Sequence, residues 1–470
     1  MQHKWLVLII SVFMFSSVCG AAPFSDDQLS LYTRDEGFIL SPLKNDLSNE
    51  IVIQLEVPDL EVDVVQINNQ EFCQFRLAEA GCTLTPGEPM VPLIGKVFQI
   101  SPTMKPVVTM RVLESREIDL PAQVLPAQDG IAPADVISVD QVRHEVYELN
   151  HWYPQRTIQS FDPEILRDVR LVPVAIHPVQ VNPVLNRARI IEKAEIVIEM
   201  RDEPTVNVKE HLGPFSPSYE QLYRAYIPNY TNPHIGEMDA SMGQGEYYLF
   251  IMPDEYLSRC QGFFTWKEQQ GFRIKVILLS EVGGYSPEHV KSALMAEYFS
   301  DETPTYVSII GGANNFPLYE SYDSYMGGMY ADDLYYSAME GDDLRADYFL
   351  SRYPVENPDE LTVMLSKIMY YETNPIMGPG VSHYYDSALM ACSGLYGSQQ
   401  LTKEQTAERL VTNLDYGTIY TMYDWSVSGS ENQVTTWINQ GLSIINYRGE
   451  GWSSGWNPGH ITGWHYDRVY

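Results

Sequence analysis

Short runs in which apolar and polar residues alternate fill the first part of the chain, up to about residue 200. Clear examples are residues 51–58, 97–102, 107–118 and 188–200. Turn-forming segments, such as TPGEP at residues 85–89, separate these runs. Alternation with a period of two, interrupted by proline and glycine, is typical of β-strands that bury one face. We therefore predict that residues 21–200 form an all-β, sandwich-like domain, and this segment offers no catalytic cluster.

The pattern changes after residue 243, where apolar runs alternate with amphipathic ones. Strands are predicted at 246–253, 273–280, 306–312, 387–394, 418–423 and 442–447, and helices at 254–272, 286–299, 358–372, 403–414 and 431–440. Ser286 and Pro287 have the residue types that begin a helix. Repeated strand–helix alternation indicates an α/β domain, with a parallel sheet flanked by helices, over residues 244–470. Residues 201–243 carry proline, asparagine and glycine, and we interpret them as a linker with one short helix at 218–226.

Several predicted strands end in small residues, which directs attention to one edge of the sheet. Gly449, Glu450 and Gly451 follow the strand at 442–447, while Gly311-Gly312 and Ser393-Gly394 follow two others. Ligand sites of parallel sheets gather at the carboxyl ends of the strands, and glycine lets another backbone approach closely. We predict an active-site rim there, with Glu450 in it.

The N-terminal sequence and the net charge limit where the protein is located and what it binds. Residues 1–20 have a lysine at position 4, an apolar run from Trp5 to Phe15 and small residues before a cleavage point, as in a secretory signal peptide. The run is too short for a stable membrane span, so we expect a secreted or cell-surface protein. The net charge of −32 argues against nucleic acid as a partner. In an exported protein, Cys73 and Cys82 could form a disulfide across a hairpin.

Four stretches of the second half resemble a known family. FTWKEQQGFRIKVI, YVSIIGGANNFP, the acidic block at 331–372 and LSIINYRGEGWSSGW are similar to gingipain-type cysteine peptidases, peptidase family C25, from about residue 246 onward. PGEPMVPLIGKVF and IHPVQVNP resemble that family's N-terminal propeptide. The resemblance implies a caspase-like α/β fold, a cysteine–histidine pair, a protein or peptide substrate, and the chain's own propeptide domain as a partner.

The chain departs from the family pattern at the residues that would carry the chemistry. The resemblance implies a histidine between two glycines at a strand end and a nucleophilic cysteine on the next strand, but Glu450 stands at the histidine position. A carboxylate would raise the pKa of a neighbouring thiol by charge repulsion. The nucleophile is expected beyond Tyr470, so we predict that residues 244–470 are an incomplete catalytic domain and that the chain as given is inactive.

Other residues near the rim leave alternatives open. His460 or His465 could replace the histidine, with Glu450 orienting the ring, or both could be ordinary loop residues. Cys392 could be a nucleophile or a small buried residue at a strand end. For Glu404, the resemblance implies the acid of a substrate pocket that binds a basic side chain.

Acidic residues are concentrated between positions 332 and 356. Carboxylates in glycine-containing loops suit Ca²⁺, and the resemblance implies structural calcium in this region. Asp332 and Asp343 are the best candidate ligands, although no EF-hand spacing is present and a solvated acidic loop is the alternative.

Three functions follow from these observations. The first is a secreted cysteine endopeptidase precursor. The second is a catalytically silent family member that acts as a binding or surface module, and the third is a sortase-like processing peptidase of a secretion system. Lys or Arg residues in 201–240, such as Arg224, are candidate points for propeptide cleavage.

Overall fold

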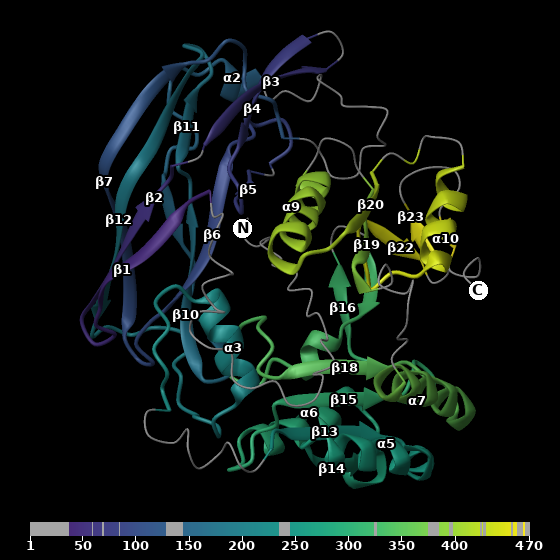
Figure 1. The fold of residues 1–470 in the computed structure, drawn as a ribbon. Helices are drawn as coiled ribbons and strands as arrows, with labels where there is room; N and C mark the ends of the chain where they lie inside the picture. The colour runs from purple at the N-terminus through teal and green to yellow at the C-terminus, as the bar shows by residue number, and fades with distance from the viewer. Residues whose placement is uncertain are drawn as a thin grey trace.

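The computed structural model places an N-terminal β-rich part beside two α/β units (Figure 1). It describes residues 37–452, 455–457 and 464–465, apart from 59, 68–69, 84, 128–143, 235–244, 324–326, 375–384, 394–397, 424 and 426–428. Within this described part, no helix is both long and apolar enough to cross a membrane.

Two antiparallel sheets form most of the N-terminal part. The first sheet contains β1 (Ile39–Asn45), β2 (Glu50–Glu56), β12 (Arg187–Arg201) and β11 (Val179–Asn182), with β7 (Lys105–Asp119) along the other side of β12. The second contains β5 (Gly81–Cys82), β6 (Pro92–Gln99), β10 (Val169–Ile176), β8 (Ile158–Ser160) and β9 (Glu164–Leu166). A hairpin of β3 (Glu61–Ile67) and β4 (Gln70–Arg76) and the short helix α2 (His144–Tyr147) lie at one end.

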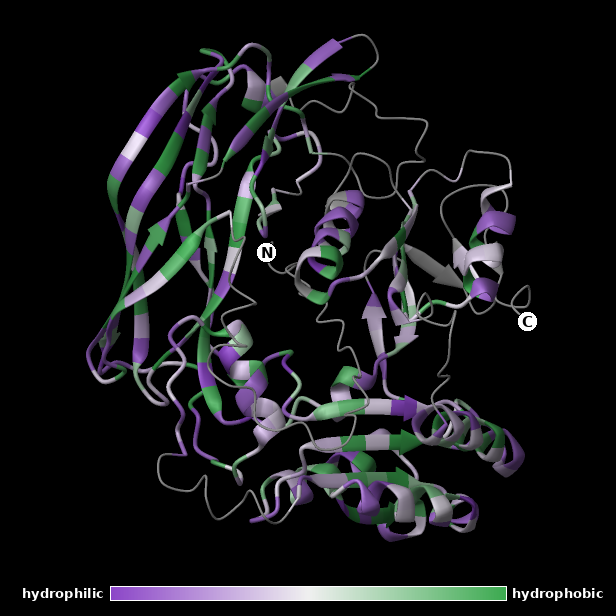
Figure 2. Cartoon of the chain, viewed as in Figure 1, coloured by the Kyte–Doolittle hydropathy of each residue, from purple (hydrophilic) through white to green (hydrophobic). Residues whose placement is uncertain are grey.

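The alternating pattern of the sequence explains how these sheets pack. In β2, Ile51, Ile53 and Leu55 are fully buried, and they share one cluster with Phe98 of β6 and Val172 of β10. Hydrophilic and hydrophobic bands follow one another along β7 and β12 (Figure 2). The two sheets therefore bury their facing sides in a common core.

The disulfide considered for this part is not formed. Cys73 and Cys82 are both buried and both are free thiols. Cys73 packs with Phe75 and Val91, whereas Cys82 belongs to a separate cluster. Each sulfur thus fills core space as a small apolar group.

The first α/β unit contains a four-stranded parallel sheet. Its strands, in spatial order, are β14 (Arg273–Leu278), β13 (Tyr247–Met252), β15 (Tyr306–Ile310) and β18 (Phe349–Tyr353). The helices are α5 (Leu257–Gln269), α6 (Pro287–Tyr298) and α7 (Pro358–Thr373), with short 3-10 turns η3 (Asp254–Tyr256), η4 (Leu279–Glu281) and η5 (Asp333–Tyr336). Leu249 and Ile251 of β13 point into the cluster that α6 covers, and Phe250 points into the cluster under α5 and α7. Helices thus cover both faces of the sheet.

The second α/β unit has its own three-stranded parallel sheet. Its strands are β20 (Thr418–Met422), β19 (Ser387–Cys392) and β21 (Ile444–Arg448), and its helices are α9 (Ser398–Leu414) and α10 (Ser430–Gln440). An antiparallel sheet of β22 (Glu450–Trp452), β23 (Gly455–Asn457) and β24 (Trp464–His465) follows β21. The expectation of one parallel sheet is therefore corrected to two. Gly311-Gly312 and Gly449–Gly451 end strands of different sheets and do not share a rim.

A hairpin that the sequence pattern did not reveal lies between the strands β15 and β18. It consists of β16 (Glu320–Asp323) and β17 (Gly328–Ala331), and the edge strand β18 was also missed. All four residues of β17 and all five of β18 are partly or fully exposed, so neither strand has the apolar run that marked the central strands.

The segment expected as a linker packs against both parts of the molecule. Helix α3 (Pro217–Tyr226) is capped by the Ser216 side chain. Its Tyr219 and Tyr223 share a cluster with Leu171 of β10 and with Phe349 of β18. The described residues of 201–243 therefore join the two parts through a core.

Candidate active site

The candidate site lies at the carboxyl ends of β19 and β21. Cys392 and Arg448 are register partners in the parallel ladder, and the Ser393 backbone N–H donates to the Arg448 carbonyl over 3.0 Å. From the loop after β20, Trp425 Nε1 donates to the Cys392 carbonyl over 2.8 Å. Cys392 itself is fully buried, so a peptide would not reach its sulfur in this arrangement.

Gly449 is required by close packing at this strand end. A Cβ atom at this position would lie 2.6 Å from Ser393 Oγ and 2.7 Å from Ser393 Cβ, and it would also collide with the Tyr447 hydroxyl. Distances below 3.0 Å are essentially absent between real Cβ atoms and their neighbours. The glycine lets β21 pass Ser393 on its way into β22, and this is the local reason for the first glycine of the Gly-Glu-Gly motif.

Lys403 brings a positive charge from α9 to the same place. Its side chain is buried, and its Nζ donates to Asn446 Oδ1 of β21. Burial and, to a smaller extent, the positive charge of Arg448 lower the pKa of the Lys403 amine to about 8, while Cys392 opposes the change. Because the hydrogen-bond acceptor is a neutral amide, the amine can lose its proton at mildly alkaline pH.

Glu450 begins the hairpin that follows β21. It is the first residue of β22, and its register partner is Asn457 of β23. The Glu450 and His465 side chains and the whole of His460 lie outside the described part of the structure. The structure thus fixes the Glu450 backbone, two residues after Arg448, at the predicted strand end.

Helix α9 carries Glu404, whose role stays a prediction, and a neighbouring residue that the sequence did not suggest, Lys403. Glu404, the proposed pocket acid, is exposed and accepts a hydrogen bond of 2.7 Å from Gln400. The preceding residue, Lys403, is buried together with Leu410. The signal was present in the helical period, because residues 403, 407 and 410 lie on one face of α9. Lys403 was missed because a lysine on a helix is normally solvated.

The acidic residues near position 340 are engaged with backbone N–H groups. Asp332 caps η5, accepting from the Leu334 N–H over 3.0 Å. Asp343 accepts from the N–H groups of Ile165 and Arg345 over 2.8 and 2.9 Å. Burial raises the pKa of Asp343 to about 6, while these two N–H groups favour its charged form.

The described residues include no group of three or more side chains of histidine, cysteine, aspartate or glutamate that could hold a metal ion. The calcium hypothesis stays a prediction, which a thermal melt with calcium and with EDTA tests directly.

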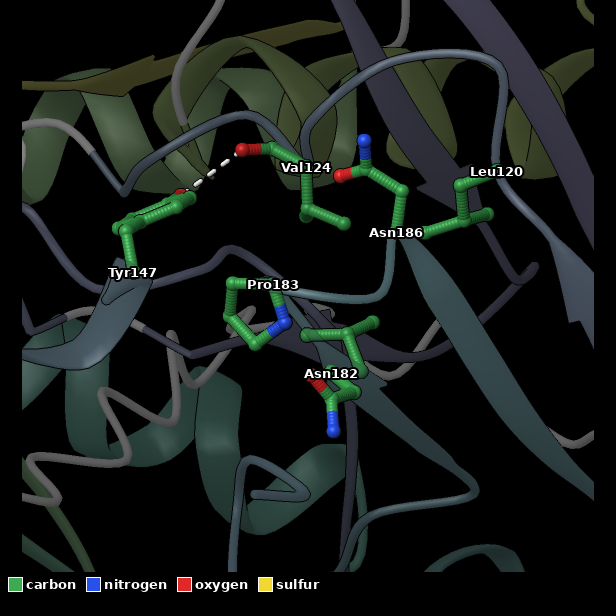
Figure 3. Close-up of a pocket in the computed structure, with 7 residues that line it drawn as sticks. Leu120, Val124, Tyr147, Asn182, Pro183 and Asn186 are labelled. Atoms are coloured by element: carbon green, nitrogen blue, oxygen red, sulfur yellow. Dashed lines mark hydrogen bonds between the residues drawn. The ribbon is translucent and has the colours of Figure 1, made fainter. Parts of the chain in front are cut away.

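A small pocket in the N-terminal part is not a candidate for the site (Figure 3). It is lined by Leu120, Val124, Tyr147, Val181, Asn182, Pro183 and Asn186. The Tyr147 hydroxyl donates to the Val124 carbonyl across it. Its lining contains no histidine, cysteine, aspartate or glutamate, so it offers no side chain for thiol or acid–base chemistry.

The sequence of the site-bearing half matches a known family. Residues 242–468 match peptidase family C25, and residues 41–214 match the C25 propeptide. The chain belongs to peptidase family C25. The C25 match includes both α/β units and the strand ends at Cys392 and Arg448, and the propeptide match covers the two antiparallel sheets.

Curated relatives are similar along most of the chain but at low identity. Gingipain R1 of Porphyromonas gingivalis is 23% identical over 466 residues, which are 97% of this chain and 45% of that protein. Lys-gingipain of the same species is 21% identical over 428 residues, 86% of this chain and 24% of the relative. The chain thus spans less than half the length of both relatives.

Two solved structures of gingipains are similar to parts of the chain, with low identity and low TM-scores. The complex of Porphyromonas gingivalis RgpB pro- and mature domains is 23% identical, with a TM-score of 0.34, and covers 41% of this chain and 96% of that one. The Arg-specific cysteine proteinase gingipain R is 19% identical, with a TM-score of 0.41, and covers 48% and 52% of the two chains.

Proposed function

We propose that this chain is the propeptide and catalytic portion of an exported, gingipain-type cysteine endopeptidase that hydrolyses peptide bonds. The observation that carries the proposal is that the C25 match runs through the strand ends of β19 and β21. In this proposal residues 21–200 are a sandwich-like propeptide and residues 244–470 belong to a caspase-like domain. Residues 1–20 direct export.

The proposed reaction is covalent catalysis by a thiolate. The cysteine sulfur attacks the carbonyl carbon of the scissile bond, the carbon–nitrogen bond breaks, and the leaving amine takes the proton that the thiol gave up. Water then hydrolyses the thioester and restores the thiol. The resemblance assigns the nucleophile to the strand after the Gly-Glu-Gly motif. Cys392 is a poor candidate, because its complete burial keeps substrate from the sulfur.

One observation favours a second candidate function, a catalytically silent binding or surface module. Glu450 occupies the position where the family places the base that activates the thiol. A carboxylate there disfavours the thiolate and offers no imidazole to protonate the leaving amine.

An assay of the protein recovered from its producing cells separates the two candidates. The peptidase proposal expects hydrolysis of peptide substrates that thiol alkylation abolishes, together with a mature N-terminus that lacks residues 1–20. No hydrolysis by the wild-type protein, with turnover gained in Glu450→His, would establish the silent module instead. No turnover in either form would overturn the peptidase proposal.

A further inference from the structure

The turn between β9 and β10 inserts an arginine into the first α/β unit. Arg167 is 1% exposed and has a positive φ of 48°. Its guanidinium donates to the carbonyls of Pro304, Thr303 and Pro214 over 2.5, 3.4 and 3.4 Å, and it lies 5.0 Å from the ring centre of Tyr219. Pro304 and Thr303 lead into β15. The arginine therefore enters at the amino-terminal end of the sheet, away from the strand ends where chemistry is expected.

Side chains of the first α/β unit also bind the backbone of the same turn. Asp343 and Asp347 accept the backbone N–H groups of Ile165 and Arg167 over 2.8 and 3.1 Å. Asp347 is fully buried. The Tyr298 hydroxyl donates to the Arg167 carbonyl over 3.3 Å. The acidic segment that the sequence suggested for calcium is thus the receptor for the β9–β10 turn.

A buried ion pair ties the segment after β12 to the same region. Lys209 Nζ lies 2.6 Å from Glu340 Oε2, and the two side chains are 5% and 8% exposed. The other oxygen of Glu340 accepts the N–H groups of Glu210 and His211 over 2.9 and 3.2 Å. Both charges would regain water if the two parts separated, so the ion pair fixes how the parts dock, and the hydrogen bonds to Glu340 add to their association.

The stretch between Arg224 and Arg259, which leads from α3 to α5, contains no arginine or lysine. The proteins that this chain resembles include an Arg-specific gingipain and a Lys-gingipain, and a cut of that kind near this stretch would fall at Arg224 or Arg259. Arg224 lies within α3, where its Nε donates to Glu220 over 2.7 Å. Arg259 lies within α5. A peptidase would have to unwind a helix to cut at either residue, which locally folded segments resist.

We propose that the N-terminal part, residues 37–234, stays bound to the α/β units in the working protein through Arg167 and is not released as a propeptide. This inference goes beyond the proposed function and holds whether or not the protein turns over substrate. The partner that the acidic segment around Asp343 and Asp347 recognises is therefore the chain's own β9–β10 turn.

The mass of the protein recovered from its producing cells shows whether the N-terminal part is kept. We expect one exported chain that contains both halves. A natural N-terminus between residues 225 and 258 would overturn the proposal. This result is independent of turnover, which is measured separately on the same sample.

An engineered cut between the two parts tests whether these contacts hold them together. A recognition sequence for a site-specific protease replaces residues 236–243 in the full chain, and the cut protein is analysed by size-exclusion chromatography at micromolar concentration. The two pieces are expected to elute together, and separate elution would overturn the proposal. Arg167→Met should raise the dissociation constant of the cut pieces at least about tenfold, because the buried carbonyls of Thr303 and Pro304 in the other piece lose their donor.

The matched control is Arg116→Met, since Arg116 pairs with Glu192 on the exposed face of the first sheet. It is expected to leave association unchanged. Co-elution of the Arg167→Met pieces with wild-type affinity would refute the role of Arg167. If that variant does not fold, the wild-type cut and the native mass still decide the matter.

Discussion

Lys403 of helix α9 donates a hydrogen bond to Asn446 of strand β21, which places a buried lysine at the carboxyl end of the second parallel sheet. The lysine lies beside Cys392 and Arg448, both of which shift the pKa of its amine. A cation there is part of the candidate site rather than of the solvated helix surface.

The buried amine of Lys403 should make stability depend on pH in the alkaline range. Its pKa is about 8 in the folded protein, below the ordinary lysine value of 10.5, so the unfolded chain binds more protons between these values. Linkage then requires this residue's contribution to the free energy of unfolding to rise with pH from about 8 to 10. We expect Lys403→Met to remove that rise, measured by urea unfolding at several pH values. An unchanged pH profile would show that the amine is not buried.

Asp347 should act in the opposite sense at lower pH. Burial raises its pKa to about 7, outweighing the hydrogen bonds from Glu340, Met339 and Arg167 that favour its charged form. The folded protein therefore holds the proton more tightly than the unfolded chain, and stability falls as pH rises from about 4 to 7. Asp347→Asn should flatten this slope in thermal melts. Asp359→Asn, at an exposed position, should keep it, and equal slopes in wild type and Asp347→Asn would contradict the assignment.

Gly449 should not tolerate even one methyl group. Gly449→Ala forces the new Cβ against Ser393 and the Tyr447 hydroxyl, and overpacking of this kind costs about 1–3 kcal/mol. Gly262→Ala is the control, because it lies in helix α5 with open space at the Cβ position and should gain up to about 1 kcal/mol. Chemical denaturation measures both, and a neutral Gly449→Ala would mean that β21 and Ser393 are not in close contact.

The buried pair of Lys209 and Glu340 should be asymmetric in its response to mutation. Lys209→Met leaves the Glu340 carboxylate buried without its cation, and we expect a loss of about 3–5 kcal/mol in the free energy of unfolding. Adding Glu340→Gln should recover part of that loss, because an amide oxygen can still accept from the Glu210 and His211 N–H groups. Lys105→Met, at an exposed pair with Glu203, should leave the unfolding midpoint unchanged. A double variant less stable than Lys209→Met would contradict this account.

Local signals in the sequence predicted the elements whose ends are set by neighbouring residues. The Ser286 cap and Pro287 begin α6 as expected, and Gly271, with a φ of 97°, follows the end of α5. These features depend on contacts within a few residues, so they can be recognised in the sequence. The edge strand β18 and the β16–β17 hairpin have no such local pattern and were missed.

The pairing of distant segments could not be predicted in the same way. Every predicted strand of the α/β half fits one long parallel sheet by its hydrophobic pattern, but the structure divides them between two. Similarly, Lys403 and Glu404 are adjacent in sequence, and only the packing of α9 on β19 decides which of them is buried.

The sequence by itself determined the class of the two halves, the family and the Gly-Glu-Gly strand end, because periodicity, turn residues and motif spacing are properties of short segments. Tertiary structure alone decided that the acidic loop receives Arg167 and its neighbours, that helix α3 packs between the two parts, and that a lysine enters the site. These outcomes depend on which distant surfaces exclude water together, and burial changes the preferred charge state of each group only after the chain has folded.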